Sequence, residues 1–218
     1  MIRITLWYFL ALLITFSCEG QSNIISVNSN YILGTAKIKS SWNVLGESKA
    51  YNTQNGYSFG FDWKSAKNLT DRYNYSISSN YNNFRIERSP KNSPSRDFEK
   101  FSYVNLRFNN FLRLTKRIDV SFSPSINYLI SLNSYTENAI GKFKTNNYFG
   151  QGFNNERIGL NKFTAAFSTG LRFRTKFGNV RLQCNSAVQP TAYIKDFAPF
   201  KLFLSSFEFG IVNPVLRF

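Results

Sequence analysis

The chain has 218 residues, a formal net charge of +15, 23 Phe and 12 Tyr, and no His. Its length fits one domain, and 17% aromatic content with a negative mean hydropathy is unusual for a soluble enzyme. A wall with one apolar face and one polar face has this composition. The lack of histidine removes the commonest general base and the commonest metal ligand.

The first twenty residues are expected to be a secretion signal. Arg3 precedes an apolar run over 6–16 that is too short to cross a bilayer as a helix, and small or polar residues follow. The sequence Ser-Cys-Glu-Gly-Gln at 17–21 allows cleavage after Gly20 or a lipid on Cys18, and the bulky Phe16 favours cleavage. Either route takes the chain out of the cytoplasm.

Beyond this segment the sequence contains no window of 18 apolar residues, so it predicts no membrane helix. A closed barrel is then the structure that could cross a bilayer with its backbone hydrogen-bonded. Such a barrel shows segments of about ten residues in which apolar and polar side chains alternate. The chain has three in its first half, at 32–44, 57–64 and 73–81. In the first of them the apolar positions are Ala36, Ile38 and Trp42.

The second half alternates more clearly, at 104–114, 118–132, 163–174 and 180–192. In 118–132 the even positions are mainly apolar and the odd ones mainly polar, which is the period of a strand. An eighth segment at 203–218 places Phe207, Phe209 and Ile211 on one face. It changes phase near Asn213 and Pro214, where we expect a β-bulge.

The spacers between these segments alternate in length. They are short at 65–71, 115–117 and 176–178 and longer at 45–56, 87–100, 133–159 and 195–201. Membrane barrels have this alternation, with short periplasmic turns and long outer loops. The sequence therefore predicts an all-β fold, an eight-stranded antiparallel transmembrane up-and-down β-barrel after a cleaved signal peptide. A soluble β-sandwich, which also alternates, is the other fold considered.

This fold divides the chain into a signal peptide at 1–20, a short N-terminal segment at 21–31 and a barrel at 32–218. With eight strands, both termini are expected on the periplasmic side of a bacterial outer membrane. The final residue, Phe218, resembles the signal that the barrel-assembly machinery recognises in a C-terminal strand.

Roughly the second half of the chain contains four notable stretches, at 103–114, 125–131, 167–173 and 181–182. These stretches resemble the PorT-like outer-membrane barrels common in Bacteroidetes. The resemblance implies a barrel of that architecture. In its best-known branch it implies an accessory part of type IX protein secretion.

Several charged side chains have the inward parity of their strands, and an eight-stranded lumen is filled by side chains. We therefore predict a structural charge network in the lumen, made of Arg107, Arg113, Asp119, Arg172, Arg174, Arg181 and Glu208. Asp62 is also expected to point inward.

Catalysis and metal binding are not expected. Known small barrel enzymes resemble one another in using histidine with serine or an acid, and this chain has no histidine. A carboxylate pair among Asp62, Asp119 and Glu208 remains conceivable, but pairing with the inward arginines is favoured. Without histidine and with two cysteines, the sequence shows no zinc or iron pattern and predicts no cofactor.

Export argues against nucleic acid as the partner of the positive charge, so outer-membrane lipid and lipopolysaccharide phosphates are expected instead. The longest predicted outer loop, 133–159, carries aromatic side chains that form a possible contact surface or fold over the barrel mouth, namely Tyr135, Phe143, Tyr148, Phe149 and Phe153. The sequence thus favours a non-enzymatic structural or accessory subunit of a larger outer-membrane assembly. The alternative is a small stand-alone ligand-binding or pore-like barrel.

Overall fold

The computed structural model describes residues 23–40, 52–65, 72–88, 96–145, 158–176, 178–194 and 200–217. These ranges consist of strands and the turns and bends beside them. No helix within them is long and apolar enough to cross a membrane. The strands are β1 (Asn23–Ser40), β2 (Asn52–Ser65), β3 (Tyr73–Arg88), β4 (Arg96–Arg113), β5 (Ile118–Asn138), β6 (Gly141–Thr145), β7 (Ile158–Leu160), β8 (Phe163–Thr175), β9 (Gly178–Ala187), β10 (Ala192–Ile194) and β11 (Phe200–Arg217).

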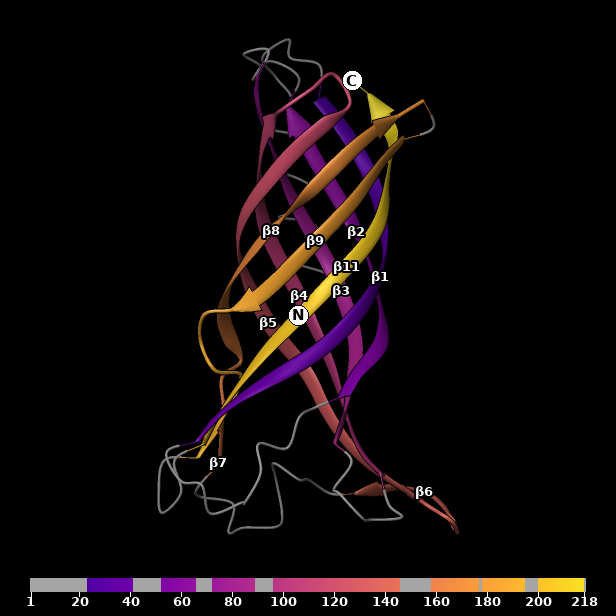
Figure 1. The fold of residues 1–218 in the computed structure, drawn as a ribbon, viewed down its shortest axis with the longest axis vertical. Helices are drawn as coiled ribbons and strands as arrows, with labels where there is room; N and C mark the ends of the chain where they lie inside the picture. Colours follow the sequence, from indigo (N-terminus) through magenta and orange to yellow (C-terminus); the bar gives the residue numbers. More distant parts are fainter. Residues whose placement is uncertain are drawn as a thin grey trace, which may run out of the picture.

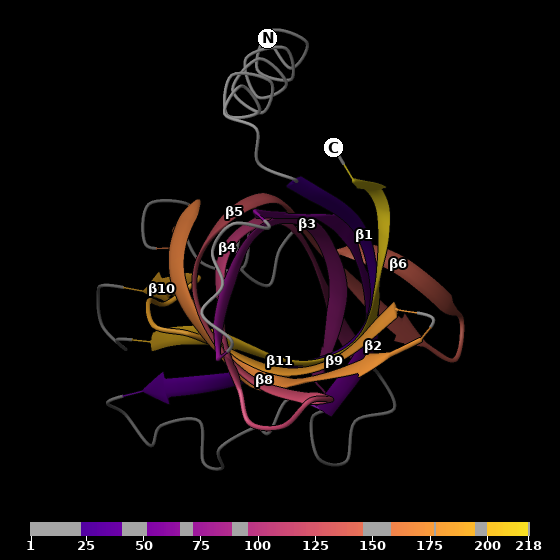
Figure 2. The same cartoon turned by 90° about the horizontal axis from the view of Figure 1, so that it is seen from above.

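The long strands close into a barrel (Figures 1 and 2). Among the described residues, eight strands follow one another around the ring in the order β1, β2, β3, β4, β5, β8, β9, β11, and β11 pairs back onto β1. Every one of these pairings is antiparallel. The predicted eight-stranded up-and-down barrel is therefore confirmed, and the alternative of a sandwich is wrong.

The two ends of the barrel differ. One end, here called the turn end, holds Asn23, Arg217, the tight connection at 114–117, the end of β8 and the start of β9. Gly178 is the first residue of β9 at this end. Its φ of 138° is a backbone conformation that residues other than glycine rarely adopt. The opposite end, the loop end, carries the three short strands. Of these, β6 pairs with β5 in a hairpin that projects beyond the ring (Figure 1). β10 pairs with β11 on one side and with β7 on the other.

Several strands reach further than the sequence predicts. β1 begins at Asn23, so 23–31 is part of the first strand rather than a segment before it. The predicted loop at 87–100 contributes its ends to β3 and β4, and the loop at 133–159 supplies the end of β5 and all of β6. β9 in turn ends at Ala187, short of the predicted 192. Polar residues continue these hairpins because hydrogen bonds between strands do not require an apolar face. The signal peptide predicted at 1–20 lies outside the described residues.

The described strand pairs have three register shifts, between Thr53 and Gly56 on β2, near Pro214 on β11 and near Ile130 on β5. Ile25 of β1 lies opposite Leu216 of β11, and the next residue, Ser26, lies opposite Pro214, so Val215 is the extra residue on β11. This confirms the bulge expected near Pro214.

The bulge near Ile130 was not predicted. Ser102 lies opposite Ser131 and Tyr103 opposite Leu129, which leaves Ile130 of β5 as the extra residue. As a result Leu132 turns into the lumen, where it packs against the buried apolar residues.

The inner and outer faces have opposite chemistry along most strands. On β5, the side chains of Asp119, Ser121 and Ser123 are fully buried, whereas Phe122 and Ile126 are each 55% exposed. β1 has the opposite phase to the one predicted. Ala36, expected on the outer face, packs against the apolar cluster inside the barrel. The alternation in this segment predicted the strand period correctly but assigned its apolar residues to the outer face. They face inward instead, because this part of the lumen is apolar.

Candidate functional site: a closed lumen

The side chains that fill the lumen make the site that the sequence singles out. Near the turn end, Asp119 of β5 lies opposite Arg172 of β8 in the strand register, and its carboxylate is fully buried. It accepts hydrogen bonds from Arg172 Nε at 2.7 Å and from Arg174 Nη2 at 2.8 Å. The Arg172 guanidinium also lies over the ring of Phe111, 3.5 Å from its centroid. One carboxylate therefore holds two guanidinium groups against one side of the lumen.

Two further ion pairs cross the lumen. Arg107 of β4 donates to both carboxylate oxygens of Glu208 of β11 at 3.2 Å, and it also donates to Gln183 of β9. β4 and β11 lie on opposite sides of the ring, four strands apart in the strand order. Each side chain of this pair is 3% exposed, so the pair bridges the barrel in a space without bulk water.

The second crossing joins Arg181 of β9 to Asp62 of β2, with Nη2 2.6 Å from Oδ2. Asp62 is buried and points inward, as its parity predicts, although it was not among the residues predicted for the network. Six of the seven residues predicted for the network take part in these pairs. The seventh, Arg113, is half-buried, and its Nε has no hydrogen-bond partner among the described residues.

The part of the lumen toward the loop end is apolar. Phe84 of β3 stacks on Phe101 of β4 with ring centroids 5.8 Å apart, and it meets Tyr103 edge-on at the same distance. Gly34 of β1 makes room for this ring, since a Cβ atom there would collide with Phe84. The buried cluster consists of Ile32, Phe84, Ile86, Phe101, Tyr103, Leu129 and Leu202.

Sequence reasoning missed this cluster. The signal available was a run of apolar residues at inward parity beyond the outer apolar band, such as Phe84 and Ile86 on β3. Inward apolar residues were not expected there, because membrane barrels of this kind usually have a polar interior.

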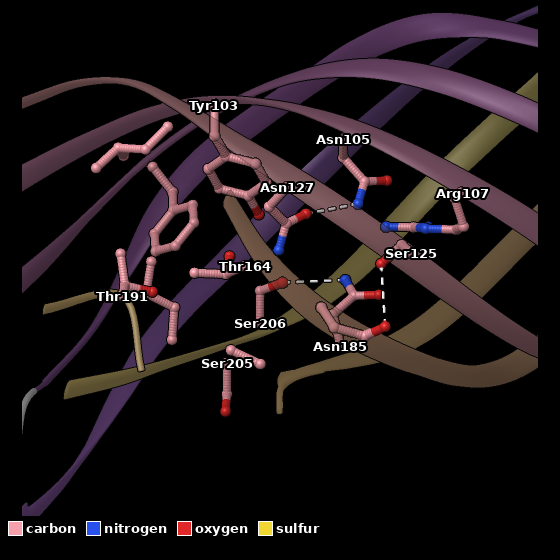
Figure 3. A pocket seen from close by; sticks show the side chains of 15 residues that line it. Tyr103, Asn105, Arg107, Ser125, Asn127, Thr164, Asn185, Thr191, Ser205 and Ser206 are labelled. Atoms are coloured by element: carbon pink, nitrogen blue, oxygen red, sulfur yellow. Dashed lines mark hydrogen bonds between the residues drawn. The ribbon is translucent and has the colours of Figure 1, made fainter. Parts of the chain in front are cut away.

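A small chamber separates the apolar cluster from the Arg107 pair (Figure 3). Its volume is about 30 Å³, which is room for about one water molecule. Asn105 donates to Asn127 at 2.6 Å and Asn185 donates to Ser206 at 3.0 Å, as Figure 3 shows. The carbonyl oxygens of Asn105 and Asn185 have no partner among the described residues, which suits an ordered water rather than an organic ligand.

The predicted aromatic contact surface is not gathered on one face. Tyr135 of β5 and Phe143 of β6 lie on opposite faces of the hairpin, because Phe143 pairs with Thr136, the neighbour of Tyr135. Tyr148, Phe149 and Phe153 lie outside the described residues.

No protein-family model matches the chain, and no curated protein sequence matches it. Similar solved structures include Ail, the attachment invasion locus protein of Yersinia pestis, at 11% identity and a TM-score of 0.42, covering 91% of this chain and 99% of Ail. Neisserial surface protein A is 10% identical with a TM-score of 0.44 and coverage of 88% and 97%. The outer membrane protein OprG from Pseudomonas aeruginosa is 10% identical with a TM-score of 0.39 and coverage of 88% and 95%. These values are too low to carry a residue role or a function over to this chain.

Proposed function

We propose that the chain is an integral outer-membrane β-barrel that works as a non-enzymatic structural or accessory subunit, with a lumen closed to transport. The observation that carries the closed lumen is the Arg107–Glu208 pair, which spans the barrel between opposite strands. With Asp119 and its two arginines at one end and the apolar cluster at the other, side chains fill the described lumen along its length. An eight-stranded barrel filled in this way leaves little room for a channel.

The outer face supports the membrane location. Within the described residues, large apolar side chains are exposed there on seven of the eight strands of the ring, all but β9, and a soluble protein rarely exposes so many together. On β5 the outward-facing apolar side chains run from the partly buried Val120 to the exposed Ile130. Ten residue steps of about 3.3 Å, at the usual tilt of about 40°, give a band about 25 Å tall, the height of an outer-membrane apolar band. The exposed apolar residues include Tyr31, Phe59, Phe61, Ile77, Leu106, Phe108, Phe122, Ile126, Phe163, Leu171, Phe207, Phe209 and Ile211.

Tyrosines mark the loop-end edge of this band. Tyr31, Tyr57 and Tyr81 occupy neighbouring strands, with Tyr31 opposite Tyr57 and Tyr57 opposite Asn83, two residues from Tyr81. The Tyr57 and Tyr81 rings are 6.5 Å apart, and Tyr128 and Phe163 are paired 4.9 Å apart on β5 and β8. Amphipathic rings collect at the level of lipid headgroups, so the loop-end rim is one membrane interface.

The finer proposal follows the resemblance to PorT-like barrels of Bacteroidetes, with a part in a type IX-like secretion assembly. Because the lumen is filled, contacts with such an assembly would come from the loop end, the turns or the outer wall. The chain would reach the membrane through the barrel-assembly machinery and leave both termini periplasmic.

Cys184 offers a direct test of the outer face. It is exposed on β9, between the outward-facing Leu182 and the exposed Ser186. A fluorophore on Cys184 should be quenched strongly by lipids brominated in their acyl chains once the barrel is in vesicles. The matched control carries Cys184→Ser together with Lys116→Cys in the turn, and a fluorophore at position 116 should be quenched weakly. Equal quenching at the two positions would contradict a membrane-spanning wall.

Two measurements test the closed, accessory role. Planar bilayers containing the purified barrel should show no steady single-channel current, and a conducting state would overturn the closed lumen. Purification from outer membranes in mild detergent should bring down a larger membrane or periplasmic protein in fixed ratio. A barrel that runs alone would favour a self-sufficient structural role.

A further inference from the structure

A groove outside the barrel, at the loop-end rim, collects positive charge. It lies over β2, β3, β4, β5 and β6 and has a volume of about 360 Å³. Three cations line it, and each is exposed: Arg85 of β3, Lys100 of β4 and Lys142 of β6. The remaining lining residues are Asn55, Gly56, Tyr57, Asn83, Phe98 and Tyr135.

The cations stand close to one another. Arg85 and Lys100 are direct partners across β3 and β4, and like charges in this position repel. Arg85 and Lys142 share one aromatic ring, with Arg85 Cζ 5.5 Å and Lys142 Nζ 5.7 Å from the centroid of Phe98. Lys142 is also 5.1 Å from the ring centroid of Tyr135. The aromatic floor thus holds the cations side by side over the groove.

Within the described ranges, no carboxylate pairs with any of the three. The nearest acidic side chain on the same face of β3, Glu87, contacts Gln54 and lies 3.9 Å from Arg96. Glu137 of β5 is exposed and is the direct cross-strand partner of Arg96 and of Lys142, but it does not line the groove. The groove therefore keeps a local surplus of positive charge that an anion could neutralise.

The position of the groove along the barrel axis indicates which anion it could bind. Tyr57 belongs both to the groove and to the tyrosine rim of the apolar band. On β3, Arg85 follows the rim residue Tyr81 by only four positions on the same face. A side chain as long as arginine at this level reaches the layer of lipid headgroups.

We propose that this groove binds the phosphate groups of a phosphorylated glycolipid headgroup in the leaflet around the loop end. The three cations would hold the phosphates, and Tyr57, Phe98 and Tyr135 would pack against the sugar. This inference rests on the membrane location proposed above. An acidic soluble protein is the less suitable occupant, because the groove opens sideways at the bilayer surface rather than at the tip of the barrel.

The test measures lipid binding by native mass spectrometry of the purified full-length mature barrel in detergent. The probe is lipid A with two phosphates, and the matched probe is the same lipid with both phosphates removed. The variant carries Arg85→Gln, Lys100→Gln and Lys142→Gln. The control carries Lys116→Gln, Arg117→Gln and Lys176→Gln, which removes the same charge from exposed positions at the turn end.

We expect the groove variant to bind the bisphosphorylated lipid at least about tenfold more weakly, since each cation beside an anionic lipid strengthens binding. The turn-end control should stay within about twofold of the parent protein. A further variant, Lys142→Arg, should retain binding because the charge stays in place.

Two results would overturn the proposal. One is an equal loss in the groove variant and the control, which would mean that overall charge, not this groove, attracts the lipid. The other is undiminished binding of the lipid without phosphates, which would mean contact through acyl chains. Heat-modifiable gel mobility of each variant reports the folded barrel separately, so a failure of the barrel itself is distinguished from a failure of the groove.

Discussion

Toward the turn end, the lumen is filled by ions, and toward the loop end it is filled by rings and aliphatic side chains. Asp119, Glu208 and Asp62 each have one or two arginine partners in the ionic part. In the apolar part, Phe84, Phe101 and Leu202 are buried against one another or against their neighbours. Both parts exclude water from the barrel, but by different physical means.

This difference predicts which substitutions each part of the lumen tolerates. A buried ion pair gains little over an apolar pair of the same volume, but losing one partner leaves an uncompensated charge. An apolar cluster loses stability in proportion to the volume removed. The ionic part should therefore be sensitive to the identity of single residues and tolerant of paired replacement, whereas the apolar part should respond to size.

The largest expected effect is at Asp119. Asp119→Asn removes the one carboxylate that Arg172 and Arg174 share, and the free energy of unfolding should fall by about 3–5 kcal/mol. Urea titration of the folded barrel in lipid vesicles, followed by gel mobility, measures this change. A loss no greater than that of the exposed control Lys116→Gln would show that the cluster is wetter than its burial indicates.

The apolar part is tested next by Leu202→Ala. Leu202 is fully buried in the loop-end cluster, and its truncation should reduce the free energy of unfolding by about 3 kcal/mol through lost contacts and a cavity. The same urea titration applies. Leu202→Met, which nearly keeps the volume, should cost less than about 1.5 kcal/mol; equal losses in the two variants would argue against tight packing there.

The pair that crosses the lumen gives a sharper test. Glu208→Leu alone should destabilise the barrel by about 3 kcal/mol, because Arg107 is left buried and unpaired. Adding Arg107→Met should restore most of that loss and leave the double variant within about 1 kcal/mol of the parent. A double variant as unstable as the single one would mean that the pair contributes more than an apolar bridge of equal size.

The smallest effect is expected outside the lumen. Lys116→Gln in the β4–β5 turn changes an exposed cation, and its effect on the free energy of unfolding should stay below about 0.5 kcal/mol. When the titration is repeated at high salt, the free energy of unfolding should change by the same amount in the parent and in this variant, because salt screens exposed charges. A larger effect would indicate that the turn end is held by contacts beyond the described ranges.

The strand count, antiparallel order and outer face could be predicted from the sequence because they depend on local patterns. Alternation over 104–114 and 118–132 places Leu106, Phe108 and Phe122 outside, and the structure has them exposed. The bulge near Pro214 could also be predicted, because the phase of the alternation changes in the sequence itself. Inward parity further identifies Arg107, Asp119 and Glu208 as lumen residues.

What only the tertiary structure decided is which inward residues meet. Arg107 finds Glu208 across the ring and Arg181 finds Asp62, because the closure of β11 onto β1 and the stagger of the strands set their heights. Alternation fixes a period of two but not which face is outside where the lumen itself is apolar, so the phase of β1 was reversed at Ala36. The bulge at Ile130, and with it the inward turn of Leu132 and the groove of Arg85, Lys100 and Lys142, likewise depends on pairings between strands far apart in the chain.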